Sequence, residues 1–159
     1  MNTLPLEDIE KKIEKAQKEW ADSIIEIGKA YLNKKDYLVL TNEFLDKLYL
    51  FNEGKVLFKP TKAHKKQFRA NKNEFISYFI GHNKVSGEDK GFALEPWKEI
   101  YFENFNTLYL EKVLVSMGNY FFTNYKNEKI KVEYTFGYIL YKENILKITF
   151  HHSSLPYKV

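Results

Sequence analysis

Apolar residues recur at spacings of three and four along the first part of the chain. This spacing puts them on one side of a helix, so it predicts a long amphipathic helix with a single buried stripe. The stripe consists of Leu6, Ile9, Ile13, Ala16, Trp20, Ile24, Ile27 and Tyr31. Thr3 is the expected N-terminal cap, and Pro5 falls in the first turn. At about 1.5 Å per residue the helix would reach roughly 40 Å, enough to cross a small domain.

Two shorter helices are expected next. Asp36 can cap a helix that carries Leu40, Phe44, Leu45 and Leu48 and ends at Asn52–Gly54. A short strand at 56–58 follows and stops at Pro60. The hydroxyl of Thr61, just after this proline, can cap a helix or face a cavity, and the cap is the simpler interpretation. Residues 73–80 predict a third helix, and 82–91 is the most loop-like stretch.

From Phe92 onward the pattern is that of strands. Residues 97–105 alternate and lead to a possible turn at 104–106; strands are then expected at 107–110 and 113–123, with a bulge or bend at Gly118. A β-hairpin spans 129–157, with its turn at Lys142–Asn144. Helices first and an antiparallel meander afterwards indicate an α+β fold. A curved sheet wrapped around the long helix would form a cone whose open mouth suits a ligand.

The last strand of the hairpin runs into His151-His152-Ser153-Ser154. Strict alternation lets His152 and Ser154 continue the apolar row Leu146, Ile148 and Phe150, while His151 and Ser153 fall on the opposite face. A histidine and a serine at the end of a buried row would be partly dehydrated. That position costs free energy unless the groups are hydrogen-bonded or used.

Composition narrows the function classes. The 159 residues fit one domain, 1–159, and are 44% hydrophobic. The absence of cysteine excludes disulfides, thiolate zinc sites and a cysteine nucleophile. No apolar run resembles a secretory signal or a bilayer span, so we expect a cytoplasmic protein without a membrane partner.

The net charge of +4 raises the question of nucleic acid. A basic run does exist, and it comprises Lys59, Lys62, Lys65, Lys66, Arg69 and Lys72. Arg69 is the only arginine, however, and arginine is the usual bidentate reader of bases and phosphates. A solvated lysine-rich face is therefore favoured over a nucleic-acid partner.

The histidines do not favour a metal site. The chain has only His64, His82, His151 and His152, and the adjacent pair on a regular strand would face opposite ways. A metal-free, hydroxyl-rich pocket is the favoured interpretation, in which a histidine and several hydroxyls orient a water and a small oxyanion. The candidate hydroxyls are those of Thr61, Tyr78, Tyr120, Tyr134, Ser153 and Ser154.

Segments 132–138 and 151–156 together resemble the end of a nuclear-transport-factor-2-like domain. The same His-His-Ser-Ser element closes ketosteroid-isomerase-like proteins and the association domain of calcium/calmodulin-dependent kinase. Segments 56–63, 67–69, 77–79, 91–94, 96–97 and 117–123 resemble the iota-class carbonic anhydrases in the right order. The resemblance covers nearly the whole chain, from about Ala16 to Tyr157.

This resemblance implies reversible hydration of carbon dioxide to bicarbonate on a cone-shaped α+β domain that forms a homodimer. Some family members are described as using no metal, and others as favouring manganese or zinc; we expect no metal here. Carried over by motif, the catalytic residues are Thr61, Tyr78, His152 and Ser154. His152 is the expected general base. The expected substrate-binding residues are His151, Ser153, Phe58, Phe79 and Phe136, the three phenylalanines as apolar walls.

Two alternatives remain at this point. A non-catalytic cone domain that binds a small ligand or mediates oligomerisation would have a pocket filled by its own aromatic side chains. An isomerase or dehydratase would need a carboxylate in the pocket. Glu133 is expected to alternate away from the row of His152, which counts against the second alternative.

Overall fold

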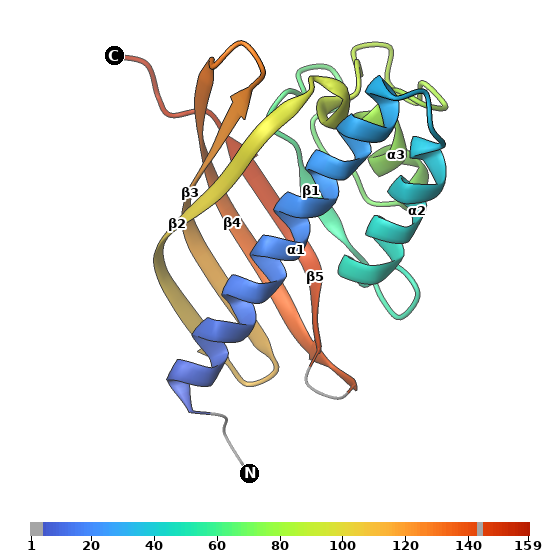
Figure 1. The fold of residues 1–159 in the computed structure, drawn as a ribbon. Helices are drawn as coiled ribbons and strands as arrows, with labels where there is room; N and C mark the ends of the chain where they lie inside the picture. The colour runs from blue at the N-terminus through green and yellow to red at the C-terminus, as the bar shows by residue number, and fades with distance from the viewer. Residues whose placement is uncertain (1–4, 143–144) are drawn as a thin grey trace.

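A long helix lies across one face of a curved five-stranded sheet in the computed structural model, which describes residues 5–142 and 145–159 (Figure 1). The elements in chain order are α1 (Leu6–Leu32), α2 (Tyr37–Leu48), β1 (Leu57–Lys59), α3 (Lys72–Ile80), a 3-10 helix η1 (Phe92–Leu94), β2 (Trp97–Leu110), β3 (Val113–Asn124), β4 (Lys129–Tyr141) and β5 (Ile145–Ser154). Helix α2 packs beside α1, and α3 packs against α2, at the edge of the sheet that carries β1 (Figure 1).

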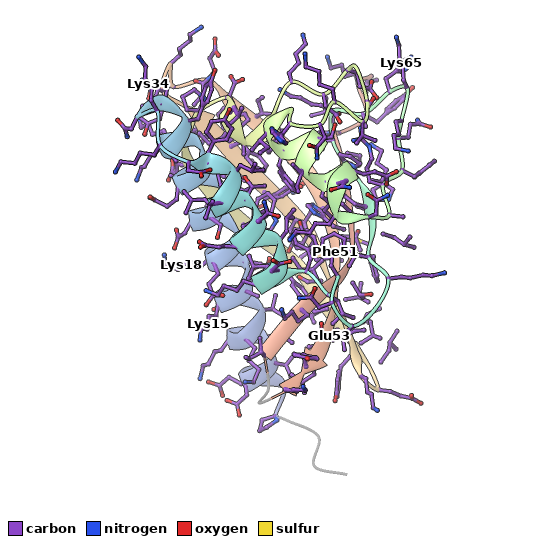
Figure 2. All side chains as sticks on the ribbon, turned by 90° about the vertical axis from the view of Figure 1, so that its right-hand side faces the viewer. Lys15, Lys18, Lys34, Phe51, Glu53 and Lys65 are labelled. Carbon is purple, nitrogen blue, oxygen red and sulfur yellow. The ribbon has the colours of Figure 1, made fainter. Side chains whose placement is uncertain are left out.

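Helix α1 buries most of its predicted apolar stripe: Ile9, Ile13, Trp20, Ile24 and Ile27 are buried and Ala16 is half-buried, while the side chain of Leu6 lies outside what the structure describes. Its inward face includes Ile13, Trp20 and Ile24, whereas Lys15 and Lys18 point away from the core (Figure 2). The prediction that Tyr31 belongs to the buried stripe is wrong, because this side chain is 44% exposed. In the last turn of α1 it packs against the ring of Tyr37 and lines a surface cavity. Pro5 is the N-cap residue, and the expected cap at Thr3 lies outside the described residues.

The two shorter helices begin at side-chain caps. Asp36 accepts a hydrogen bond from the backbone N–H of Val39, which confirms it as the cap of α2. Asn71 caps α3 in the same way, and Gly81 ends α3 in the left-handed conformation. Helix α2 ends at Leu48, before the predicted stop at 52–54. Among the described residues, none of the helices combines the length and hydrophobicity that a membrane crossing requires.

The sheet has the order β1-β5-β4-β3-β2. Strands β2 to β5 form an antiparallel meander, which confirms the predicted hairpin, while β1 pairs with β5 in parallel. The expected turn at 104–106 is wrong, since β2 continues to Leu110 with a register shift at this point. The irregularity expected at Gly118 is confirmed, because the register with β2 shifts directly after the pair of Gly118 and Asn104. A Cβ at Gly118 would lie 2.3 Å from the carbonyl oxygen of Glu103.

A second register shift lies between β4 and β5, and it decides which side chains enter the core. Gly137 pairs with Phe150 but Tyr138 pairs with Ile148, so Thr149 is an extra residue in β5. The ring of Phe150 covers Gly137, where a Cβ would lie 2.0 Å from a ring atom. The bulge inverts the alternation, so His151 follows Ile148 on the buried face.

The basic run is not simply a solvated face. Arg69 is fully buried and forms two hydrogen bonds, of 2.7 and 2.9 Å, with the equally buried carboxylate of Asp89. Ser77 on α3 also donates to Asp89, at 2.5 Å. Glu88 accepts from the backbone N–H groups of residues 64–66 at 2.9 to 3.0 Å. Because of these bonds the loop 82–91 is fixed to the segment that follows β1. Lys65, by contrast, points into solvent (Figure 2).

Candidate active site

His151 is the centre of a buried polar cluster between the sheet and α1. The side chain is 2% exposed. Its Nδ1 lies 3.0 Å from the hydroxyl of Tyr49, and its Nε2 lies 3.1 Å from the hydroxyl of Tyr120 and 3.0 Å from Oγ of Ser153. The hydroxyls of Tyr120 and Ser153 are also hydrogen-bonded to each other. Three hydroxyl groups therefore share one imidazole, and we call this group with Trp20 the hydroxyl–histidine cluster.

Four elements bring the cluster together. His151 and Ser153 are two residues apart on β5 and so lie on the same face. Tyr120 comes from β3, two strands away in the sheet. Tyr49 is the C-cap residue of α2, held against the sheet by its bridge to Ile148. Trp20 of α1 donates its indole N–H to the hydroxyl of Tyr49 at 3.0 Å.

Thr61 and Tyr78 extend the cluster toward the surface. The hydroxyl of Tyr78 accepts from the backbone N–H of Lys62 at 3.4 Å. Burial raises the pKa of Tyr78 and of Tyr120, and the nearby hydroxyl of Thr61 opposes the rise in each case. Thr61 therefore lies near both phenols, and both phenols keep their proton at neutral pH.

The imidazole of His151 is enclosed by aromatic rings. The Phe58 ring stacks on it with centroids 4.5 Å apart, and the Phe136 ring meets it edge-on at 4.1 Å. This burial, with a smaller contribution from the charge of His152, holds the pKa of His151 well below its usual value. His151 is therefore neutral at pH 7, as are the hydroxyl groups around it.

The expectation that His152 and Ser154 face the pocket is wrong. His152 is exposed, and Ser154 donates to Glu133 at 3.2 Å on the outer face of the sheet. The physical reason is the bulge at Thr149, which turns the pair His151 and Ser153 inward instead. Glu133 therefore shares the face of Ser154, contrary to the expected alternation, and is remote from the cluster.

The other predicted residues divide into two groups. Thr61 and Tyr78 lie near Tyr120 of the cluster, and Phe58, Phe79 and Phe136 form its apolar surround. The ring of Phe79 packs on that of Phe58, with centroids 5.6 Å apart.

Tyr134 belongs to a separate polar network. Its hydroxyl lies 3.1 Å from Nε2 of Gln17 and 3.2 Å from Oγ of Ser116, and it also bonds to Asn104. Tyr134 is thus not one of the hydroxyls around His151.

The sequence did not point to Tyr49 or to a polar role for Trp20. The signal available for Trp20 was its indole N–H within a buried stripe, since a buried indole N–H usually finds an acceptor. Tyr49 sits at a helix end whose pairing with the sheet no local pattern reveals.

A cavity of about 460 Å³ borders Tyr78 at the surface. It lies between the end of α1 and the loop before η1, and its lining includes Tyr78, Lys62, Glu88 and Asp89. A second cavity, of about 490 Å³, borders His151 from the β1 edge and is lined by Phe58, Phe68 and Phe150 among others. The first cavity is the more polar of the two, whereas the second is the one that His151 itself lines.

Within residues 5–142 and 145–159, no group of three or more histidine, aspartate or glutamate side chains could hold a metal ion.

Comparisons with known proteins agree with this geometry. The sequence profile of the family described as "Metal-independent carbonic anhydrase" matches residues 11–155. A metal-independent carbonic anhydrase of Nostoc sp. is 32% identical over 152 residues, which cover 94% of this chain and 74% of the relative. The crystal structure of a cyanobacterial iota-carbonic anhydrase complexed with bicarbonate superimposes with a TM-score of 0.89 at 31% identity, covering 94% of this chain and 93% of that one.

The fold alone is shared more widely. A protein of the nuclear transport factor 2 superfamily from Salmonella enterica superimposes with a TM-score of 0.60 at 10% identity, covering 98% of this chain and 96% of the other. The chain therefore has the α+β fold of nuclear-transport-factor-2-like proteins, as the sequence predicts.

Proposed function

The chain belongs to the metal-independent carbonic anhydrase family, and we propose that it interconverts carbon dioxide and bicarbonate at the hydroxyl–histidine cluster. The family resemblance in the sequence is thereby confirmed. What supports the choice of site is a single observation: Ser153 and Tyr120 converge on the buried imidazole of His151, with Thr61 and Tyr78 near Tyr120.

The reaction demands a site for a small oxyanion. A water oxygen attacks the carbon of carbon dioxide, a C–O bond forms, one C=O electron pair moves onto its oxygen, and a proton leaves to a base. Negative charge therefore develops on oxygen atoms. Hydroxyl donors in a site shielded from water stabilise such charge, and one such donor is typically worth a factor of 10² to 10³ in rate.

The structure suggests a role for each group. Ser153, Thr61 and Tyr78 donate to the oxygens of the substrate and hold the attacking water. The rings of Phe58 and Phe136 give carbon dioxide, a nonpolar molecule, apolar walls. His152 is no longer a candidate for the general base, since it lies on the outer face of the sheet.

We also propose that two copies of the chain pair through the outer face of the sheet. This face exposes apolar side chains, with Phe105 81% and Met117 50% exposed, and both border a depression of about 620 Å³. Sedimentation equilibrium checks this: a dimer is expected, and a monomer at high micromolar concentration would contradict the pairing.

The decisive experiment for the function is stopped-flow hydration of carbon dioxide by the purified protein, before and after exhaustive chelation. Hydration faster than in buffer alone, and unchanged by chelation, is expected. Activity that disappears with chelation and returns with an added ion would contradict a metal-independent site. Absence of activity in both states would overturn the proposed function and leave a cone domain that binds a ligand or mediates assembly.

A further inference from the structure

We infer that Trp20 and Tyr49 are positioning residues that hold His151 in one tautomer, with its proton on Nε2. In this form the ring donates toward Ser153 and Tyr120, and its Nε2 cannot take a proton from either hydroxyl. The tautomer follows from hydrogen-bond geometry alone. Its consequence for the reaction rests on the proposed function.

The direction of the bonds begins at Trp20. An indole N–H can only donate, so the hydroxyl oxygen of Tyr49, 3.0 Å away, must accept. Tyr49 is 1% exposed, so its own hydrogen cannot be given to bulk water. Among the described residues, the other polar atom at hydrogen-bond distance from this hydroxyl is Nδ1 of His151, at 3.0 Å. Tyr49 therefore donates to Nδ1, and Nδ1 carries no proton.

The opposite tautomer leaves a group unpaired. With a proton on Nδ1, the hydroxyl oxygen of Tyr49 would receive two donors and its own hydrogen would have no acceptor. A buried hydroxyl without its partner costs enough to bias the two tautomers by roughly tenfold to a hundredfold. A neutral imidazole has only one N–H, so the proton resides on Nε2.

The same direction continues on the other side of the ring. The Nε2–H group lies 3.1 Å from the oxygen of Tyr120 and 3.0 Å from that of Ser153, so these oxygens accept from it. Within the Tyr120–Ser153 bond, one of the two hydroxyls donates its hydrogen to the other. The hydroxyl that accepts keeps its own hydrogen and can donate it to a further acceptor. All bonds from Trp20 onward thus run one way, and each strengthens the next.

This orientation changes the part that His151 plays in the proposed reaction. A row of aligned donors ends at the hydroxyl groups and favours an oxyanion such as bicarbonate. The proton released in hydration would leave through water or a buffer base, because Nε2 is already protonated and Nδ1 is occupied by Tyr49. His151 therefore polarises the hydroxyl groups and is not the base.

The test is ¹⁵N NMR of protein labelled at histidine, because ring nitrogens with and without a proton have well-separated chemical shifts. An unprotonated Nδ1 and a protonated Nε2 are expected for His151 near pH 7. A proton on Nδ1 would overturn the inference. The His152→Gln variant identifies which signals belong to the exposed neighbour, and it should leave the tautomer of His151 unchanged.

The Tyr49→Phe variant removes the hydroxyl but keeps the ring, and here the preference for Nε2–H should fall by about tenfold or more, with a lower kcat. An unchanged tautomer in this variant would contradict the role of Tyr49, and the wild-type spectrum remains decisive if the variant does not fold. The spectrum also separates the tautomer inference from the proposed function. An inactive protein with Nε2–H upholds the tautomer and refutes the proposed function. An active enzyme with Nδ1–H supports the proposed function and refutes the tautomer.

Discussion

Replacing Ser153 and Ser154 separately by alanine tests whether the bulge in β5 selects the catalytic pair. The two serines are adjacent in sequence, yet only Ser153 is bonded to the hydroxyl–histidine cluster. Ser154 makes one bond of 3.2 Å, to the exposed Glu133 on the outer face. The two variants are therefore matched in chemistry and opposite in expected effect.

The magnitudes follow from these contacts. Ser153→Ala removes two hydrogen bonds in a buried site, so it should lower the free energy of unfolding by about 1–3 kcal/mol. It also removes one donor to the developing oxyanion, which predicts a loss of about 10² to 10³ in kcat, or about 2.7–4 kcal/mol in the barrier. Ser154→Ala should change stability by less than about 0.5 kcal/mol and leave kcat within a factor of two or three.

Stopped-flow hydration of carbon dioxide gives kcat and KM for both variants, and urea unfolding gives their stability. The stability measurement is needed because a partly unfolded Ser153→Ala protein would also lose activity. A folded Ser153→Ala enzyme with full kcat would refute the reasoning. So would the reverse pattern, in which only Ser154→Ala is inactive.

Three further predictions concern stability, each measured by urea unfolding. Asp89→Asn should lower the free energy of unfolding by about 3–5 kcal/mol, because it leaves the buried arginine unpaired. Asp46→Asn, in a surface pair, should lower it by less than about 1 kcal/mol. Equal losses in the two variants would be evidence against this interpretation. Folding depresses the pKa of His151, so as the pH falls the unfolded chain takes up this proton before the folded protein does. The contribution of His151 to the free energy of unfolding should be fully present above about pH 6.5 and should fall below it by up to about 1.4 kcal/mol per pH unit. A His151→Gln variant that keeps this slope would contradict the assignment. Gly137→Ala should cost about 1–3 kcal/mol, since the new Cβ meets an aromatic ring of β5, whereas Gly87→Ala, with open space around it, should cost less than about 0.5 kcal/mol; no difference between the two would disprove the steric argument.

Most of the fold was accessible from the sequence because periodicity reports burial directly. The stripe of α1, the cap at Asp36 and the hairpin of β4 and β5 each follow from a local pattern. The parallel pairing of β1 with β5 is different, since it joins segments about ninety residues apart and leaves no local mark.

The site was only partly accessible for a specific physical reason. Alternation assumes a regular strand, and one extra residue at Thr149 moves every later side chain to the other face. The sequence does contain one sign of this irregularity, because Gly137 on the neighbouring strand makes room for the ring of Phe150. A glycine in a strand does not, however, identify the residue at which the bulge occurs. The burial of Arg69 could not be predicted either, because its partner Asp89 lies twenty positions away in a loop.

The most direct test of the central claim is a crystal structure of the protein soaked with bicarbonate. The account predicts bicarbonate inside the cone, with its oxygens within about 2.7–3.1 Å of Oγ of Ser153 and of the Thr61 or Tyr78 hydroxyl. Bicarbonate bound instead on the outer face of the sheet, beside His152 and Ser154, would contradict it.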